Sequence, residues 1–258
     1  MSQGKDTVKQ TIIIAATLSL VCSVIVSVAA VKLRPIQEKN KALDKKTNIL
    51  MAASLYEEGA EVEKLFKKFV QPKLVNLADG SYVEGQDAQE YDQYKESKNS
   101  EERVVLDPKV DLAGLRMIAR YAVVYEVEKD GKLDQVVVPI HGKGLWSTLY
   151  GFVSVSSDGN TIKGLGYYEH GETPGLGGEV DNPNWKASWK GKQIRDKAGN
   201  LQIEVIKGKV DLAREEALHQ VDGLSGATIT ARGVSHMVRF WLGENGFKNY
   251  FEHIKEKS

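Results

Sequence analysis

The sequence predicts an α+β protein: one transmembrane helix near the N-terminus, followed by a domain built on a mostly antiparallel sheet with flanking helices. Three observations predict this: an uncharged apolar stretch, two pairs of strand-like runs that each flank an Asp-Gly turn, and an amphipathic helical pattern near the C-terminus. Of the 258 residues, 41% are hydrophobic and 27% charged, which is typical of a chain that buries a core. The 35 basic and 35 acidic side chains give a formal net charge of zero. A nucleic-acid-binding surface is therefore not expected, because it needs an excess of Lys and Arg.

The first element is the apolar stretch at residues 11–31, which follows a short N-terminal segment, residues 1–10, and reads TIIIAATLSLVCSVIVSVAAV. As a helix it is long enough to cross the roughly 30 Å hydrocarbon layer of a bilayer. A cleavable signal peptide is the alternative, because Lys5 and Lys9 precede the run and residues 27–29 offer small residues for cleavage. The run is long for a signal peptide, so we expect a retained transmembrane helix. Cys22, the only cysteine, lies in this stretch, so the rest of the chain has no thiolate for a disulfide or a metal.

Residues 32–102 are predicted to form a helical linker and a polar surface segment. Val62, Leu65 and Phe66 begin an apolar stripe with helical spacing, which Phe69 and Val70 continue. Pro72 is expected to end that helix, because proline interrupts helical hydrogen bonding. Residues 79–102 are polar and rich in tyrosine, which favours a surface segment over core.

The domain is predicted to span residues 103–258 and to begin with strands. Runs at 121–127 and 136–140 flank Asp130-Gly131, and runs at 149–155 and 162–168 flank Asp158-Gly159. Apolar runs around Asp-Gly are typical of antiparallel hairpins. A further strand is expected at 201–206 and a short helix at 212–220.

The last predicted helix carries an apolar stripe at Val234, Met237, Val238 and Trp241, so residues 225–230 lie at its N-terminus. Such an end presents unpaired N–H groups and binds a phosphate well. Two alternatives stay open at this point. Ser225 or Thr228 caps the helix, or Ser225 is a hydrolase nucleophile with His219 or His236 as its base, although the closing glycine of a nucleophile elbow is missing.

Glycine-rich segments at 141–146, 169–178 and 222–228 are the remaining candidates for chemistry. None matches a P-loop or the GxGxxG dinucleotide motif, so nucleotide binding is not predicted. The five histidines are scattered without metal-ligand spacing, and no metal site is predicted.

The segment from Asp222 to Thr228 reads DGLSGAT and resembles the flavinylation signature Asp-x-x-Ser/Thr-Gly-Ala-Thr of proteins that carry FMN through a phosphoester to the last threonine. The segments ETPGLG at 172–177 and GLW at 144–146, and a single N-terminal membrane helix, occur in the same order as in one family. Over essentially its whole length, the chain resembles the NqrC family of the bacterial sodium-translocating NADH:quinone oxidoreductases. The RnfG family of the Rnf complex is a near relative, but the longer segment with Trp185 and Trp189 favours NqrC.

The resemblance implies FMN bound covalently to Thr228 by a separate flavin transferase, with Asp222 helping recognition or transfer. It also implies that the 172–177 loop and Trp146 lie against the isoalloxazine ring. Lys207 directly follows the strand expected at 201–206 and is a candidate phosphate contact by that position, with a solvated surface lysine as the alternative. No catalytic residue and no metal ligand is expected. The expected cofactor-binding residues are Thr228, Asp222, Ser225, Gly226, Ala227, Trp146, Glu172, Thr173, Gly175, Leu176, Gly177 and Lys207.

The function expected from the resemblance is that of a membrane-anchored electron-carrier subunit of a sodium-pumping NADH:quinone oxidoreductase. Its partners are the other subunits of the complex, which bind NADH and form the sodium path, because this chain has neither a dinucleotide motif nor more than one predicted membrane helix. The alternatives are an RnfG-type electron-transport protein with the same covalent FMN, a cofactor-free membrane-tethered binding protein, and a membrane-anchored serine hydrolase.

The resemblance also implies the bacterial inner membrane, with residues 1–10 in the cytoplasm and the large domain on the periplasmic side. The positive charges around the apolar stretch predict the opposite, because Lys32, Arg34 and further lysines follow it. Large domains are translocated largely regardless of flanking charge, so we expect the periplasmic side.

Overall fold

The computed structural model describes residues 8–99 and 101–255, which fall into two compact units, Met1–Asp44 and Lys45–Ser258. Helix α1 (Val8–Ala52) begins in the first unit and ends in the second. Its large apolar side chains from Val8 to Val31 are exposed, as a membrane span requires, and within the described residues this is the only helix long and apolar enough to cross a bilayer. The helix continues past the predicted end at Val31, with Pro35 inside it. The structure is thus consistent with a single membrane anchor.

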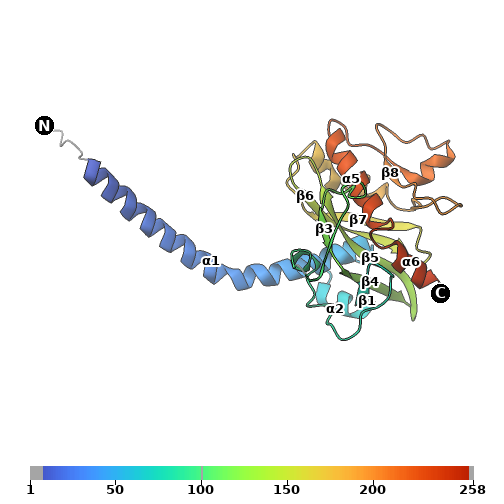
Figure 1. The fold of residues 1–258 in the computed structure, drawn as a ribbon, viewed down its shortest axis with the longest axis horizontal. Helices are drawn as coiled ribbons and strands as arrows, with labels where there is room; N and C mark the ends of the chain where they lie inside the picture. The colour runs from blue at the N-terminus through green and yellow to red at the C-terminus, as the bar shows by residue number, and fades with distance from the viewer. Residues whose placement is uncertain (1–7, 100, 256–258) are drawn as a thin grey trace. The chain divides into compact units, whose positions relative to one another are not determined.

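The second unit is built on a five-stranded antiparallel sheet (Figure 1). Both predicted hairpins are confirmed, and Asp130 and Gly131 have the positive φ values, 52° and 75°, that the first turn needs. The strands, in spatial order, are β1 (Val70–Asn76), β4 (Tyr121–Lys129), β5 (Lys132–Lys143), β6 (Thr148–Ser156) and β7 (Ile162–Glu169).

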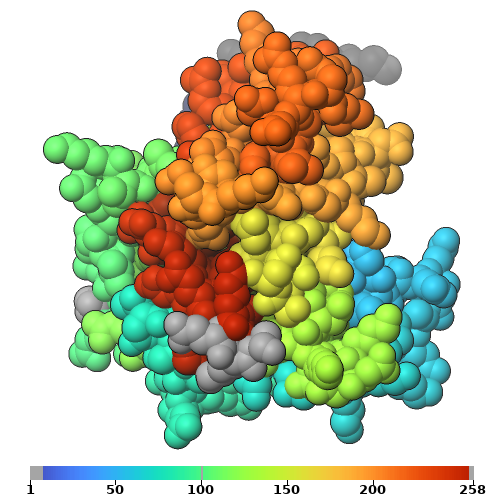
Figure 2. Space-filling model, turned by 90° about the vertical axis from the view of Figure 1, so that its right-hand side faces the viewer, coloured from blue at the N-terminus to red at the C-terminus, as the bar shows by residue number. Residues whose placement is uncertain are grey.

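The sheet is covered on both faces, which explains the almost continuous apolar run of β5. Val136, Val138 and Ile140 face one core, whereas Val137 faces the other. The first core contains α5 (Thr228–Trp241) and α6 (Lys248–Lys255). Figure 2 shows α6, in red, against the yellow surface of the β6–β7 hairpin.

Helix α5 lies very close to the end of β5. A Cβ on Gly142 would lie 2.7 Å from Met237 Cβ, and one on Gly233 would overlap the carbonyl oxygen of Lys143. The Trp241 Nε1–H donates to the carbonyl of His141 at 2.7 Å. Glycine is therefore required at this crossing, which places the N-terminus of α5 beside the β5–β6 turn.

The second core is formed by the last turns of α1 and by α2 (Val62–Phe69). Ile49, Leu50 and Phe66 pack there against the sheet. The expectation that Pro72 ends the helix is wrong: α2 ends at Phe69, and Pro72 lies within β1, opposite Tyr125. Proline fits there because β1 is an edge strand.

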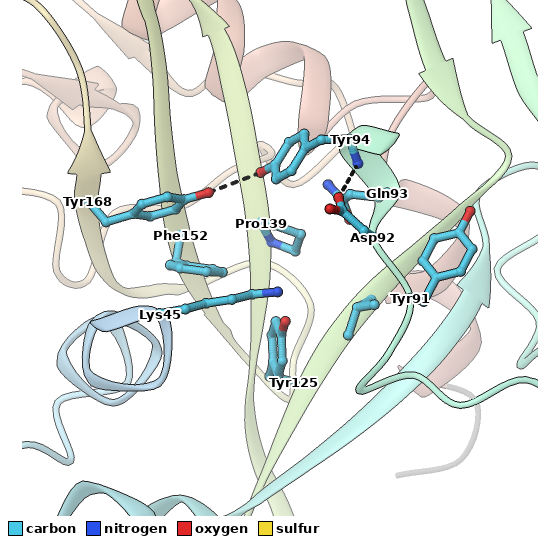
Figure 3. Close-up of a pocket in the computed structure, with 10 residues that line it drawn as sticks. Lys45, Tyr91, Asp92, Gln93, Tyr94, Tyr125, Pro139, Phe152 and Tyr168 are labelled. Carbon is cyan, nitrogen blue, oxygen red and sulfur yellow. Dashed lines mark hydrogen bonds between the residues drawn. The ribbon is translucent and has the colours of Figure 1, made fainter. Parts of the chain in front are cut away.

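The tyrosine-rich segment at 79–102 is only partly the surface segment that the sequence predicts. It contains the short helix α3 (Gln93–Glu96), which Asp92 caps by accepting from the Tyr94 and Lys95 N–H groups. Gln93 is buried, and the Tyr94 ring packs edge-on against Tyr150. A small cavity of about 20 Å³ is left between α3 and the sheet. Figure 3 shows the residues that line it, with the hydroxyls of Tyr168 and Tyr94 pointing toward each other; the two oxygens are 3.5 Å apart.

The remaining elements are short. The strand expected at 201–206 is only β8 (Glu204–Val205), and the helix expected at 212–220 is the 3-10 helix η2 (Glu215–His219) followed by β9 (Gln220–Val221), which pairs in parallel with β8. Gly208, with φ of 89°, turns the chain soon after β8. The others are β2 (Arg103–Val105), β3 (Met117–Ala119), η1 (Gly177–Asp181) and α4 (Pro183–Ala187).

Candidate functional site

The N-terminus of α5 carries no side-chain cap. Gly226 turns the chain with φ of 71°, Ala227 is the N-cap residue, and no side chain accepts a hydrogen bond there. The interpretation of Ser225 or Thr228 as a cap is therefore wrong. Thr228 is exposed at the first helical position, where the helix geometry leaves backbone N–H groups without acceptors. This end of the helix is open to an anion.

Three segments that are distant in sequence meet at this helix end: residues 144–147, 172–177 and 226–230. The segments approach so closely that a side chain at their glycines would make a neighbouring side chain shift. A Cβ on Gly226 would lie 2.9 Å from Leu176 Cδ2, and one on Gly177 would lie 2.6 Å from Thr230 Oγ1. The structure therefore brings together the motif segments that the sequence analysis singled out separately.

The carboxylate of Glu172 joins these three segments. Its oxygens accept from the N–H groups of Leu145 at 3.3 Å, Trp146 at 3.0 Å and Ser147 at 3.3 Å, and from the Thr230 hydroxyl at 2.5 Å. The side chain is buried, with the residue 5% exposed. Glu172 therefore acts as a clamp between the β5–β6 turn, its own loop and the first turn of α5.

Burial alone would favour the neutral acid of Glu172. The hydrogen bonds from the Thr230 hydroxyl and from the backbone outweigh this effect and hold the pKa of Glu172 below its usual range. Glu172 is thus an anion at neutral pH. Because the oxygens of Glu172 are engaged within the protein, this geometry favours a positioning role for Glu172 over the direct flavin contact expected from the resemblance.

Apolar surface is exposed on either side of the clamp. Trp146 is 71% exposed and Leu176 45%, and Ile229 on α5 is also exposed. The loop that presents Leu176 is a tight turn, in which the Thr173 carbonyl accepts from the N–H of Leu176 at 3.1 Å and Gly175 has φ of 75°. Flat aromatic and aliphatic surfaces of this kind can cover an aromatic ring system.

Asp222, the first residue of the signature, is not at the helix end itself. Its carboxylate accepts from the Val210 N–H at 2.8 Å and from Lys209 Nζ at 2.7 Å, and its carbonyl accepts from Trp185 Nε1 at 2.8 Å. Burial opposes ionisation, but the bonds from Lys209 and Val210 hold the pKa of Asp222 below its usual range. Asp222 thereby anchors the start of the signature to the 207–210 loop.

A cavity of about 510 Å³ runs along α5, and we call it the α5 groove. Both Thr228 and the predicted phosphate contact Lys207 line it, whereas Trp146, Glu172 and Leu176 do not. Thr228 therefore lies where the exposed apolar surface and the groove meet. The α5 groove is lined by Glu204, Val205, Ile206, Lys207, Gly208, Leu224, Thr228, Ala231, Arg232, Ser235, His236 and Arg239.

Thr230 and the arginines of the groove, Arg232 and Arg239, were not predicted as site residues from the sequence. Thr230 lies on the buried face of an amphipathic helix. Because a buried hydroxyl without a hydrogen-bond partner is costly, this position could have indicated that Thr230 has a polar partner. In the sequence, Arg232 and Arg239 appeared only as charged residues on the polar face of the last predicted helix.

The arrangement does not support a serine hydrolase. Within the described residues, no hydrogen bond joins Ser225 to His219 or His236, and the His219 Nδ1 lies instead 2.8 Å from the carbonyl oxygen of Gln193. Among the described residues, no group of three or more His, Cys, Asp or Glu side chains is placed to hold a metal ion.

The chemistry of the site fits a flavin phosphate. A threonine hydroxyl is exposed at an uncapped helix N-terminus, the cation Lys207 shares a cavity wall with it, and apolar surface for a planar ring lies beside it. Each of the three requirements, attachment, phosphate charge and ring cover, is met by residues of this chain.

Comparison with known proteins agrees with this geometry. The family model described as FMN-binding domain matches residues 144–243, which include all three segments of the site. The NqrC protein of the Na⁺-translocating NADH-quinone reductase of Pseudomonas aeruginosa is 45% identical over 256 residues, covering 98% of each chain. That of Haemophilus ducreyi is 45% identical over 253 residues, covering 98% of this chain and 96% of the relative.

Two solved structures share the fold. The crystal structure of Shewanella oneidensis NqrC has a TM-score of 0.77 at 41% identity, covering 84% of this chain and 99% of that chain. The structure of the corresponding protein from Parabacteroides distasonis has a TM-score of 0.66 at 31% identity, covering 85% and 96%. With this identity over nearly its full length, the chain belongs to the NqrC family of the Na⁺-translocating NADH-quinone reductases.

Proposed function

We propose that this chain is the membrane-anchored electron carrier of its reductase and holds FMN covalently, through a phosphoester to Thr228. The observation that carries the proposal is the uncapped N-terminus of α5 with an exposed threonine hydroxyl at its first position. The N-cap position belongs to Ala227, so the Thr228 hydroxyl at the next position is not used as a cap, and its exposure next to free N–H groups favours a phosphate ligand.

The phosphate of a threonine ester keeps a negative charge. The N–H groups of the first turn and the positive end of the helix dipole stabilise that charge, typically by about 0.3–1 kcal/mol at an exposed helix end. Lys207, which lines the α5 groove together with Thr228, supplies a cation.

When bound, the isoalloxazine ring takes up and releases electrons, and the protein's part is to position it and control its surroundings. Trp146 and Leu176 cover the ring and exclude water from it. Glu172 holds the backbone that carries Trp146 and, through Thr230, fixes that backbone to α5. These hydrogen bonds keep Trp146, which covers the ring, at a fixed distance from Thr228, which carries the FMN.

The remaining steps, NADH binding, sodium transport and attachment of the FMN, are assigned to partner proteins. Other subunits of the reductase bind NADH and form the sodium path, and a flavin transferase attaches the FMN. The family resemblance supports the inner membrane, with the domain on the periplasmic side. The single apolar helix α1 supplies the anchor.

The test is a denaturing gel of the protein produced with its flavin transferase, viewed under ultraviolet light. A fluorescent band is expected for the wild type and for Ser157→Ala, which removes a hydroxyl outside the signature, but not for Thr228→Ala. Absence of the band from the wild type, with the transferase shown to be active, would overturn covalent attachment. A band that persists in Thr228→Ala would overturn the site.

A further inference from the structure

The α5 groove carries positive charge that the rest of the chain does not neutralise. Lys207, Arg232 and Arg239 line it, and no carboxylate among the described residues forms an ion pair with any of the three. The acidic residue of the groove is Glu204, whose carboxylate accepts from Gln220 Nε2 at 3.2 Å. Three fixed cations therefore face one carboxylate within a concave site.

The imidazole of His236 responds to this charge. Burial lowers the pKa of His236 first, and Arg232 and Arg239 lower it further because a second positive charge is unfavourable beside them. His236 is thus neutral at pH 7, and the fixed charges of the groove are those of the lysine and the two arginines. A cleft lined by one sign of charge focuses its field and attracts opposite charge.

A flavin phosphate on Thr228 does not use all of this charge. Arg232 and Arg239 follow Thr228 by four and eleven residues, which places them about 6 and about 16 Å farther along the helix axis at about 1.5 Å per residue. A single phosphate at the N-terminus of α5 is close to Lys207 but is beyond the reach of Arg239. The far half of the groove is left for another anion.

The surroundings of the far half favour a protein as that anion. The His236 ring interacts with the backbone of Leu112, and the side chains of Leu112 and Val110 are 46% and 40% exposed. Exposed aliphatic side chains beside arginines are typical of protein interfaces, where Arg is enriched. This chain is one subunit of a larger assembly, so it must present such surfaces.

We infer that the α5 groove is the docking surface for an acidic segment of another subunit of the same reductase, which binds between Lys207 and Arg239 and so comes to lie beside Thr228. Charge complementarity of this kind orients an encounter and speeds it, and weakens with ionic strength. The role of this docking surface in electron transfer rests on the proposed flavin attachment to Thr228. The positive charge of the groove does not depend on that attachment.

The experiment compares the assembled complex containing Arg232→Glu with matched controls. Arg232 is exposed and forms no ion pair among the described residues, so its reversal leaves the fold of the domain intact. Lys132→Glu makes the same change of charge at the exposed β4–β5 turn, and Arg232→Lys keeps the charge of the groove. The rate of NADH-driven reduction of the flavin on this chain is followed by rapid mixing, at fixed sodium and increasing potassium chloride.

We expect Arg232→Glu to slow this reduction by about tenfold at low ionic strength and to flatten its dependence on potassium chloride. Lys132→Glu should behave as the wild type, and Arg232→Lys, which keeps the charge of the groove, should retain the salt dependence of the wild type. Equal rates for Arg232→Glu and the wild type would overturn the inference. So would a loss of flavin loading on the gel with a normal rate in the loaded fraction, because the groove would then serve attachment. If the wild type itself carries no gel-stable flavin, the proposed function fails instead.

Discussion

The carboxylate of Glu172 accepts a hydrogen bond from the hydroxyl of Thr230, 58 residues later in the chain, at 2.5 Å. Both residues are buried. The same carboxylate accepts from the backbone of the β5–β6 turn, so one charge holds three parts of the site together. A buried carboxylate with so many donors is stabilising as long as every donor stays in place.

Glu172→Gln tests this clamp because it keeps the shape of the side chain but replaces an acceptor oxygen by an NH₂ group. The new donor faces backbone N–H groups or the Thr230 hydroxyl, so we expect a loss of about 2–3 kcal/mol in the free energy of unfolding. Urea unfolding of the full chain in detergent, followed by tryptophan fluorescence, measures it. Glu169→Gln is the control, since Glu169 is exposed, and should change stability by less than about 0.5 kcal/mol. Equal stability of the two variants would contradict the clamp.

The pH dependence of stability provides a second test of Glu172. Its pKa in the folded chain is lowered, whereas an unfolded glutamate titrates near about 4.3. The unfolded state therefore binds more protons in acid, so the stabilisation is complete above the unfolded pKa and is lost as the pH falls through the folded one. The difference in unfolding free energy between the wild type and Glu172→Gln should shrink as the pH is lowered from about 4.3 towards the folded pKa, which lies below that value. A difference that stays constant would show that the carboxylate charge is not its cause.

Gly226→Ala should destabilise the protein in two ways. The residue has φ of 71°, which strains any side chain, and the new Cβ would lie 2.9 Å from Leu176 Cδ2. We expect a cost of about 1–3 kcal/mol, together with reduced loading of flavin on the gel, because Leu176 must move. Gly199→Ala is the matched control: its φ is 86°, but its Cβ would meet nothing within 4 Å, so it tests the strain without the contact. Normal loading in both variants would argue against a role of the Gly226–Leu176 contact.

Trp146→Ala tests whether the indole shields the flavin ring without contributing to the stability of the fold. Because Trp146 is 71% exposed, its removal should change the free energy of unfolding by less than about 0.5 kcal/mol. If the indole covers the flavin, iodide should quench the fluorescence of the bound flavin more strongly in the variant than in the wild type. Leu212→Ala, which removes another exposed apolar side chain, should leave quenching unchanged. Identical quenching in all three proteins would place the ring elsewhere.

Much of the fold was predictable because the signals are local. An uncharged apolar run, Asp-Gly turns between apolar strands, and the apolar stripe of α5 each depend on neighbouring residues only. The same holds for the position of Thr228 at a helix N-terminus. The strand β1 was missed because Pro72 is unfavourable in most strands, and only the edge position in the sheet makes it acceptable.

By itself the sequence determined the apolar anchor, the two hairpins, the last amphipathic helix and the signature threonine at its start. The tertiary structure alone decided that Glu172 and Thr230 form one clamp, that Thr228 is exposed rather than a cap, and that Lys207, Arg232 and Arg239 share one groove. The physical reason is that periodicity and turn chemistry are properties of neighbouring residues. The partners of a buried carboxylate and the summed charge of a cavity depend on which distant segments the fold brings together.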